Sequence, residues 1–283
     1  MTFLEPRALN DPIAYITCLH DLGRGNADGR GIDEYLRWLL KTANLLPNLM
    51  VFTDIQDVRD LMPPHVRVID FNFSQFDLYG SRQDISAICA EQILRNRSND
   101  VTVTVPDYAI LQFGKFQLLD IATSLTEAPL MAWVDAGICR FANSDSRVQA
   151  GRERLIADIM DDAESLLEVD FRKNVSFGRI RYVDAGTFRK TFSGGMLVIN
   201  RLSTDRYRNS MIKRALSWLE NKVWDNEQIG LNQLFHAGEL SPLILRQEGE
   251  PGTLIRFLQG LNTLQVIRPV QKKYERLRAK SWR

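Results

Sequence analysis

The sequence predicts an α/β domain in which a mixed, mostly parallel central sheet is flanked by helices. Three observations lead to this prediction. Apolar runs of strand length alternate with segments whose apolar residues recur at helical spacing. Short breaks containing Pro, Gly and Asn separate them, as in parallel α/β sheets. The chain shows no internal repeat and no interdomain linker, so we expect one domain over residues 1–265 and a basic tail over 266–283.

The N-terminal half carries a strand–helix–strand pattern. We expect strands at residues 13–19, 49–52 and 66–69, and helices at 32–45, 83–97 and 107–125. The first of these helices has its apolar residues at 32, 35, 36, 39 and 40, which is the spacing of one helix face. Residues 101–105 alternate Val and Thr, which predicts either a short edge strand or an extended loop.

The C-terminal half continues the alternation. An apolar strand runs up to Asp135, and a polar, surface-exposed helix is expected at 147–167. Later strands are predicted at 180–183, 195–199 and 242–245, and helices at 204–219 and 226–236. The sheet is therefore expected to extend beyond the strand at Asp135.

Composition excludes several classes of protein. Hydrophobic residues make up 45% of the chain, charged residues 25%, and the formal charge of +1 gives no reason to expect nucleic-acid binding. The three cysteines lie far apart without a CxxC or His/Cys cluster, which favours a reducing cytoplasm over a disulfide scaffold or a structural zinc site. No apolar run reaches the roughly 20 residues of a spanning helix, and the N-terminus lacks signal-peptide features. We expect a cytoplasmic protein.

Asp135 is the leading site candidate. It ends a buried strand, and in open α/β sheets ligands bind beyond the carboxyl ends of the strands. A buried acid is costly unless it has a partner, so Asp135 either binds a ligand or metal or caps the next segment. A second acid at Gly137 would complete a carboxylate pair suited to Mg²⁺ or Mn²⁺, and this chain lacks it.

Glycines at 194 and 195 open the next apolar strand. They predict either a β-bulge or a place where the backbone approaches a ligand. Residues 225–228, Asp-Asn-Glu-Gln, begin a helix, and capping explains them as well as binding does. Lys115 lies on the helix at 106–125, where a solvated lysine is the simplest expectation.

A polar turn follows the first strand and contains His20, Asp21 and Arg24. Such a turn is a common nucleotide contact in doubly wound sheets, with Arg24 suited to a phosphate, although a surface turn with Asp21 as a cap is equally consistent. The chain contains no GxGxxG, GxxxxGK[ST] or GxSxG motif, which disfavours dinucleotide binding, P-loop chemistry and serine hydrolysis. The three histidines are too scattered to predict a site.

The tail from residue 268 to 283 carries seven basic residues against one acid, with apolar and aromatic residues near helical spacing. A basic amphipathic helix of this kind can lie on an anionic membrane surface, which would suit a peripheral location on the inner membrane and a lipid-linked acceptor. A solvated terminal helix packed on the domain explains the same pattern.

In their order, these segments resemble the HtrL/YibB family of bacterial proteins, often encoded among surface-polysaccharide genes. The resemblance spans roughly residues 14–235 and rests on residues 17–25, 35–36, 51–54, 106–108 with Lys115, 133–137 and 193–195. The chain is also similar to glycosyltransferases of the GT-A fold, in which a strand ends in Asp-x-Asp. Here Asp135-Ala136-Gly137 takes that place. Residues 192–200 are similar to a later motif of these enzymes, Asn-Ser-Gly-Val-Met-Leu-Ile-Asn. Residues 227–232 match in part a further motif, Asp-Gln-Asp-x-Leu-Asn.

The resemblance implies a single Rossmann-like GT-A-type domain that transfers a sugar from a nucleotide-sugar donor to a glycan or lipid-linked acceptor in lipopolysaccharide or capsule biosynthesis. It implies donor contacts, a residue that orients or deprotonates the acceptor, and a divalent metal. The implied donor residues are Asp21, Arg24, Lys115, Asp135, Gly194, Gly195 and Gln228. Glu227, with Asp225 as second choice, is implied for the acceptor, and Asp135 for Mn²⁺ or Mg²⁺. Two alternatives stay open, a sugar nucleotidyltransferase and a catalytically silent nucleotide-sugar-binding protein.

Overall fold

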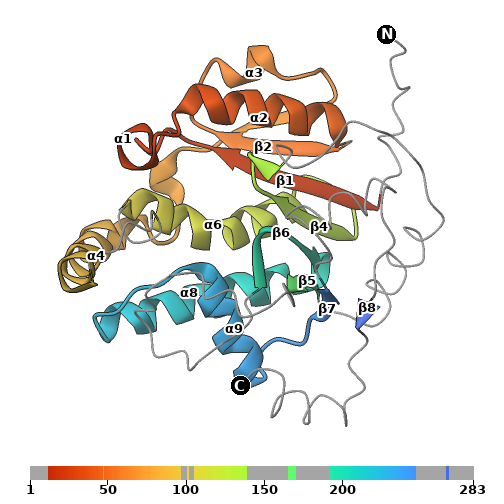
Figure 1. Cartoon of the computed structure of the whole chain (residues 1–283). Helices are drawn as coiled ribbons and strands as arrows, with labels where there is room; N and C mark the ends of the chain where they lie inside the picture. The colour runs from red at the N-terminus through yellow and green to blue at the C-terminus, as the bar shows by residue number, and fades with distance from the viewer. Residues whose placement is uncertain are drawn as a thin grey trace.

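One mixed sheet runs through the protein (Figure 1). The computed structural model describes residues 12–46, 48–96, 101, 105–138, 165–169, 192–246 and 266–267. Within them the sheet has eight strands in the order β3-β2-β1-β4-β6-β5-β7-β8. The strands are β1 (Ile13–Leu19), β2 (Leu49–Thr53), β3 (Arg67–Asp70), β4 (Leu130–Val134), β5 (Ser165–Val169), β6 (Phe192–Asn200), β7 (Leu243–Arg246) and β8 (Val266–Ile267).

The strand directions create a topological switch point beside β1. Strand β1 pairs in parallel with β2 on one side and β4 on the other, and β2 pairs in parallel with β3. The chain therefore builds the sheet outward from β1 to β3 and then returns to place β4 on the opposite side. Ligands of open α/β sheets bind at such a switch point, beyond the carboxyl ends of the strands. Strand β6 runs antiparallel to β4, so its beginning lies at the same edge.

Helices cover both faces of the sheet (Figure 1). Helices α2 and α3 pack on one face, and α4, α6, α8 and α9 pack on the other. The described helices are α1 (Gly25–Asp28), α2 (Ile32–Leu45), α3 (Val58–Leu61), α4 (Arg82–Asn96), α6 (Pro106–Thr123), α8 (Thr204–Glu220) and α9 (Glu227–Ala237), with short 3₁₀ turns η1 (Phe73–Gln75), η2 (Tyr79–Ser81) and η4 (Arg201–Ser203). The predicted α/β architecture is confirmed.

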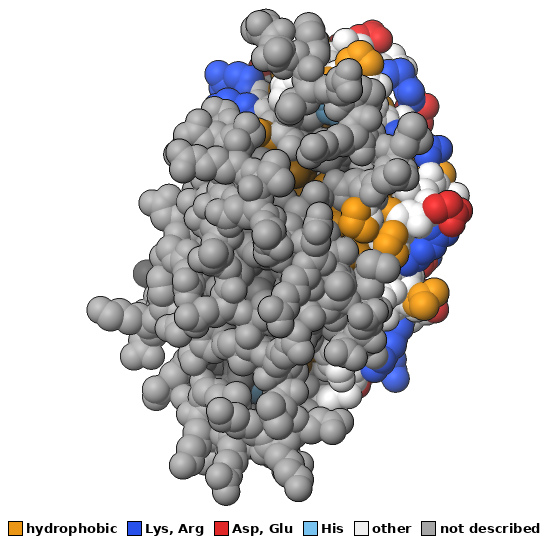
Figure 2. All heavy atoms as spheres, turned by 90° about the vertical axis from the view of Figure 1, so that its right-hand side faces the viewer, with side chains coloured by type: hydrophobic (Ala, Val, Ile, Leu, Met, Phe, Trp, Pro, Cys, Tyr) orange, Lys and Arg blue, Asp and Glu red, His pale blue; other side chains and the backbone are white. Residues whose placement is uncertain are grey.

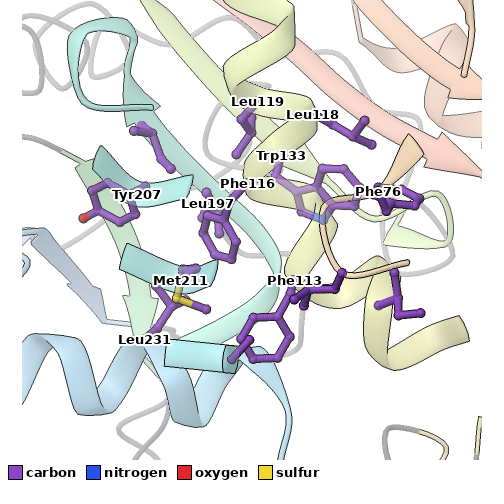
Figure 3. Close-up of a cluster of buried hydrophobic side chains, with 14 of the residues drawn as sticks. Phe76, Phe113, Phe116, Leu118, Leu119, Trp133, Leu197, Tyr207, Met211 and Leu231 are labelled. Carbon is purple, nitrogen blue, oxygen red and sulfur yellow. The ribbon is translucent and has the colours of Figure 1, made fainter. Parts of the chain in front are cut away.

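The two faces of β1 carry different parts of the core. Alternate side chains of a strand point to opposite faces, so Ala14, Ile16 and Cys18 join the core under α6, whereas Ile13 and Tyr15 join the core under α2. The core under α6 is rich in aromatic rings, including Phe113, Phe116 and Trp133 (Figure 3). Strand β4 is buried on both faces, as expected for the middle of an α/β sheet.

Polar contacts fix the ends and positions of the helices on the α6 face. Helix α6 starts with Pro106 at its first turn, where proline is favoured. The Arg208 guanidinium of α8 donates to the Asp77 carboxylate at 2.8 Å and to Asp120 of α6 at 2.9 Å. Helix α9 has Asn226 as its N-cap and ends at Gly238, whose φ of 76° is readily adopted by glycine. Arg208 therefore joins α8 to α6, and the two caps define where α9 begins and ends.

Most predicted elements are confirmed to within a residue or two, and one prediction is wrong in part. The helix expected at 147–167 fails at its C-terminal end, because residues 165–167 form part of β5, which pairs with β6 and β7 on its two sides. Periodicity cannot separate so short an apolar run from the end of a helix. Of the two alternatives for residues 101–105, the described residues do not show the edge strand: Val101 is helical, and Val105 precedes α6 in the extended conformation that a loop would have. The predicted strand at 180–183 and the tail at 268–283 lie outside the described residues.

On the described part of the face shown in Figure 2, basic and acidic side chains lie near one another. In the part of the chain that the structure describes, no helix is both long enough and apolar enough to cross a membrane.

Candidate functional site

Asp135 lies at the switch point of the sheet. It follows β4 directly, next to the carboxyl end of β1, and its backbone N–H donates to the carbonyl of Gly195 at 2.9 Å. The indole Nε1 of Trp133 donates to Asp135 Oδ1 at 2.7 Å. This charge-assisted bond offsets the cost of a partly buried carboxylate and fixes its direction.

Lys115 is buried and connects three elements. Its side chain is 3% exposed, and its Nζ donates to the Gly194 carbonyl of β6 at 2.8 Å and to Glu227 Oε1 of α9 at 2.7 Å. The same ammonium lies 5.7 Å from the centroid of the Trp133 ring, within the range of a cation–π contact. The expectation of a solvated lysine is wrong, because a buried ammonium requires the acceptors that β6 and α9 supply.

Glu227 begins helix α9 beside this lysine. Its side chain is 1% exposed, and its Oε2 is buried without a hydrogen-bond partner among the described residues. The helix N-terminus favours negative charge there. The neighbouring Asp225 is also buried and accepts the backbone N–H of Asn226 at 2.8 Å. Asn226, rather than an acid, caps the helix by accepting from the N–H of Ile229 at 3.2 Å.

The double glycine lies at an irregularity in the pairing of β6, which matches the β-bulge alternative, and approach of its backbone to a ligand stays a prediction. Leu167 of β5 pairs with Leu197 of β6, and Val169 pairs with Phe192. Between these two pairs β6 contains more residues than β5, so β6 is irregular around the glycines. A Cβ atom on Gly194 would lie 2.2 Å from Glu227 Oε1 and 2.8 Å from Gln228 Nε2. A side chain is therefore excluded where β6 meets the start of α9. The described contacts use the carbonyls of Gly194 and Gly195 rather than their amides.

Arg24 lies between two tyrosine rings. The residue is 8% exposed, and its guanidinium carbon lies 4.3 Å from the Tyr108 centroid and 5.3 Å from the Tyr35 centroid. Burial raises the pKa of the Tyr108 hydroxyl; the charge of Asp135 acts in the same direction, and that of Arg24 opposes it. Tyr108 therefore stays protonated at neutral pH and is electrostatically coupled to both charged residues.

Asp21 sits at the margin of the site. Its side chain is exposed and accepts the backbone N–H of Gly23 at 3.0 Å, forming a local turn in which Gly23 has a φ of 65°. This contact matches the turn-forming alternative for Asp21. The turn directly precedes Arg24 in the chain.

One pair of polar side chains at the same edge of the sheet was not predicted from the sequence. His20 follows β1 and Asp54 follows β2, and the two side chains meet at 2.9 Å through His20 Nδ1 and Asp54 Oδ1. A carboxylate only accepts, so Nδ1 carries the proton, and Nε2 is buried without a partner in the described region. Burial lowers the pKa of His20 more than Asp54 raises it. Each residue lies at the end of a predicted parallel strand, and this shared position is the sequence feature from which the pair could have been predicted.

The predicted metal site has one carboxylate at its centre. Gly137, which replaces the second acid of the motif, packs so closely on Trp38 that a Cβ would lie 3.0 Å from its ring. Among the residues that the structure describes, no three His, Cys, Asp or Glu side chains are grouped to hold a metal. The described residues do not fit a bound divalent cation, and the assignment of Mn²⁺ or Mg²⁺ to Asp135 stays a prediction.

No protein-family model matches the chain, and no curated protein matches it. Resemblance to the HtrL/YibB family therefore stays a prediction. The solved structures to which the chain is similar include two of different activity. Core-mannan synthase A (CmsA/Ktr4) from Aspergillus fumigatus, in its Mn/GDP form, has a TM-score of 0.49 and 9% identity, with 87% of this chain and 81% of that chain covered. The 4-diphosphocytidyl-2C-methyl-D-erythritolsynthase from Anaerococcus prevotii has a TM-score of 0.37 and 12% identity, with coverage of 85% and 90%. At such identities, function has to be argued from the site.

Proposed function

We propose that the protein is a glycosyltransferase that uses a nucleotide-sugar donor. The observation that carries the proposal is the convergence of Arg24, Lys115, Asp135, Gly194 and Glu227 at the switch point of the sheet, although they come from five separate segments. The set offers a cation for phosphate, a carboxylate for hydroxyl groups and a second carboxylate for a proton. A nucleotide sugar and a hydroxyl acceptor need these three functions together.

Arg24 is proposed to bind the diphosphate. A guanidinium presents a planar fork of donors that matches phosphate oxygens, and the rings of Tyr35 and Tyr108 hold its plane. Charge builds on the diphosphate as its bond to the anomeric carbon breaks, so a cation fixed in advance favours the transition state. Asp135 is proposed to accept hydrogen bonds from the ribose or the donor sugar. Asp21, Gly195 and Gln228 are proposed to complete the donor site.

Glu227 is proposed to receive the proton of the acceptor hydroxyl. In this step the acceptor oxygen forms a bond to the anomeric carbon, the diphosphate leaves with the electron pair of the broken C–O bond, and Oε2 takes the proton. Oε1 is held by Lys115, which leaves Oε2 for this role. We propose that Lys115 acts by fixing Glu227 and Gly194, because two of its ammonium hydrogens are already used there. Asp225 is the second choice for the proton acceptor.

The proposal for the acceptor and the location rests on the sequence alone. We propose a glycan or lipid-linked acceptor in lipopolysaccharide or capsule biosynthesis, supported by the resemblance to the HtrL/YibB family and by the basic tail at 268–283. Such a tail would bring a cytoplasmic enzyme to an anionic membrane surface.

Ligand-induced thermal stabilisation tests the donor site. Purified protein is screened against UDP-, GDP-, CMP- and dTDP-linked sugars and the free nucleotides, each with and without Mn²⁺. A bound ligand raises the melting temperature by mass action. We expect a rise with one nucleotide family that is reduced in Asp135→Asn and retained in Asp70→Asn. Asp70 also ends a strand, but its side chain is 91% exposed and paired with Arg59, so it is a matched control. No rise at millimolar ligand would contradict the proposal.

Product analysis separates the remaining alternatives. A glycosyltransferase releases a nucleoside phosphate from the nucleotide sugar, whereas a nucleotidyltransferase consumes a nucleoside triphosphate and a sugar phosphate and releases pyrophosphate. The sequence Gly23-Arg24-Gly25 after β1 is the feature that supports the nucleotidyltransferase alternative. A silent binder would show the thermal rise without either product.

A further inference from the structure

Trp133 touches two charged residues of the candidate site. Its indole N–H donates to Asp135 at 2.7 Å, and the centroid of its ring lies 5.7 Å from the Lys115 ammonium. The residue is 1% exposed and belongs to the core under α6 (Figure 3). One rigid side chain therefore contacts the proposed donor carboxylate and the lysine that holds Glu227.

A purely structural role for Trp133 would not require a charged partner for its indole N–H. A buried indole N–H needs an acceptor, and a backbone carbonyl or a neutral side chain satisfies it. Trp218 shows this case in the same protein, since its Nε1 donates to Gln233 Oε1 at 3.1 Å. Trp133 instead donates to the carboxylate at the carboxyl end of its own strand, two residues on, where alternation brings the side chains of 133 and 135 to the same face.

We infer that Trp133 is a positioning residue that orients the Asp135 carboxylate toward the donor. This inference rests on the proposed function. Because the indole holds Oδ1, rotation of the carboxylate is restricted, and Oδ2 is the oxygen left for a hydroxyl of the donor. The ring also restricts the position of the Lys115 ammonium, which in turn holds Glu227. Trp133 thereby helps to set the position of the Asp135 carboxylate relative to that of Glu227. Pre-orientation of this kind lowers the cost of ordering the site when ligand binds.

Trp133→Phe tests the inference, because it retains an aromatic ring and removes the N–H donor. The probe is the nucleotide sugar that raises the wild-type melting temperature most, and its dissociation constant is measured by calorimetry. A hydrogen bond to a charged group is strong enough that we expect Trp133→Phe to weaken binding about tenfold. In the Asp135→Asn background, the same substitution should weaken binding less than about twofold, since the carboxylate it orients is gone. Trp218→Phe, the matched control, should bind as the wild type does.

Each outcome decides the inference. Wild-type affinity in Trp133→Phe, equal weakening in both backgrounds, or equal weakening by Trp218→Phe would overturn it while leaving the proposed function intact. A wild-type protein that binds no nucleotide sugar overturns the proposed function and the inference with it. If Trp133→Phe does not fold, the assigned indole N–H signals of the wild type are followed by NMR. The Trp133 signal should then move more than the Trp218 signal when the nucleotide sugar is added, and equal or smaller movement overturns the inference.

Discussion

Nζ of Lys115 lies 2.7 Å from Oε1 of Glu227, in an ion pair that joins helix α6 to the first turn of helix α9. Both side chains are almost fully buried. Removing two charges from water is costly, and a buried pair repays this cost only with good geometry and further hydrogen bonds. The Gly194 carbonyl supplies one such bond to Lys115. The pair is therefore better understood as fixing the site than as adding stability.

Lys115→Met should destabilise the protein strongly. The substitution leaves the Glu227 carboxylate buried without its cation, which typically costs about 3–5 kcal/mol. The free energy of unfolding from urea denaturation measures the loss. The double variant Lys115→Met/Glu227→Leu should recover much of it, since an apolar pair replaces both charges.

An exposed ion pair supplies the control for this experiment. Arg59 and Asp70 meet at 3.0 Å with side chains 55% and 91% exposed. Arg59→Met should change the free energy of unfolding by no more than about 1 kcal/mol, because exposed pairs contribute little. Equal effects of Lys115→Met and Arg59→Met would contradict the role assigned to the buried pair.

Gly194→Ala should disturb the contact between β6 and α9. The new methyl group would lie 2.2 Å from Glu227 Oε1, which Lys115 holds in place. Overpacking of this kind costs about 1–3 kcal/mol, and displacement of Glu227 should also lower any transferase activity. Thermal unfolding and the nucleotide-release assay measure the two effects. Gly80→Ala is the control, since a Cβ there meets nothing within 4 Å, and an equal loss in both variants would argue against the steric explanation.

The fold was predictable because its signals are local. Strand β1 and helix α2 match their predicted bounds, since a β-branched apolar run and a regular helical face leave little ambiguity. The end of the helix predicted at 147–167 was wrong because β5 owes its state to β6 and β7, which lie elsewhere in the sequence. Tertiary pairing of this kind overrides local pattern.

The site was predictable only in part. Asp135, Gly194 and Glu227 stood out because strand ends, glycine pairs and helix starts mark the edge of an α/β sheet. The partners of Lys115 were not predictable, since 79 and 112 positions separate it from Gly194 and Glu227. The same holds for the stacking of Arg24 on Tyr108 and for the pairing of His20 with Asp54, which depend on how helices and neighbouring strands meet.

Stability should fall at mildly acidic pH through His20. Burial lowers its native pKa below the ordinary value of 6.5, so below that pH the unfolded chain binds a proton that the native protein does not. The free energy of unfolding therefore decreases as the pH falls from 6.5 toward the native pKa. His20→Asn removes this titration. Urea denaturation at about pH 7 and about pH 5 should show a larger loss in the wild type than in the variant, and equal losses would refute the assignment.

Arg24→Lys should weaken recognition of the diphosphate while retaining the positive charge. Lysine lacks the planar fork of donors and the flat face that stacks on Tyr108, so binding of the free nucleoside diphosphate should fall at least about tenfold. Binding of the parent nucleoside, which has no phosphate, should change little. Calorimetric titration of both ligands gives the ratio, with the exposed Arg59→Lys as control. An equal loss for nucleoside and diphosphate would mean that Arg24 supports the site as a whole, and unchanged binding of both would remove it from the donor site.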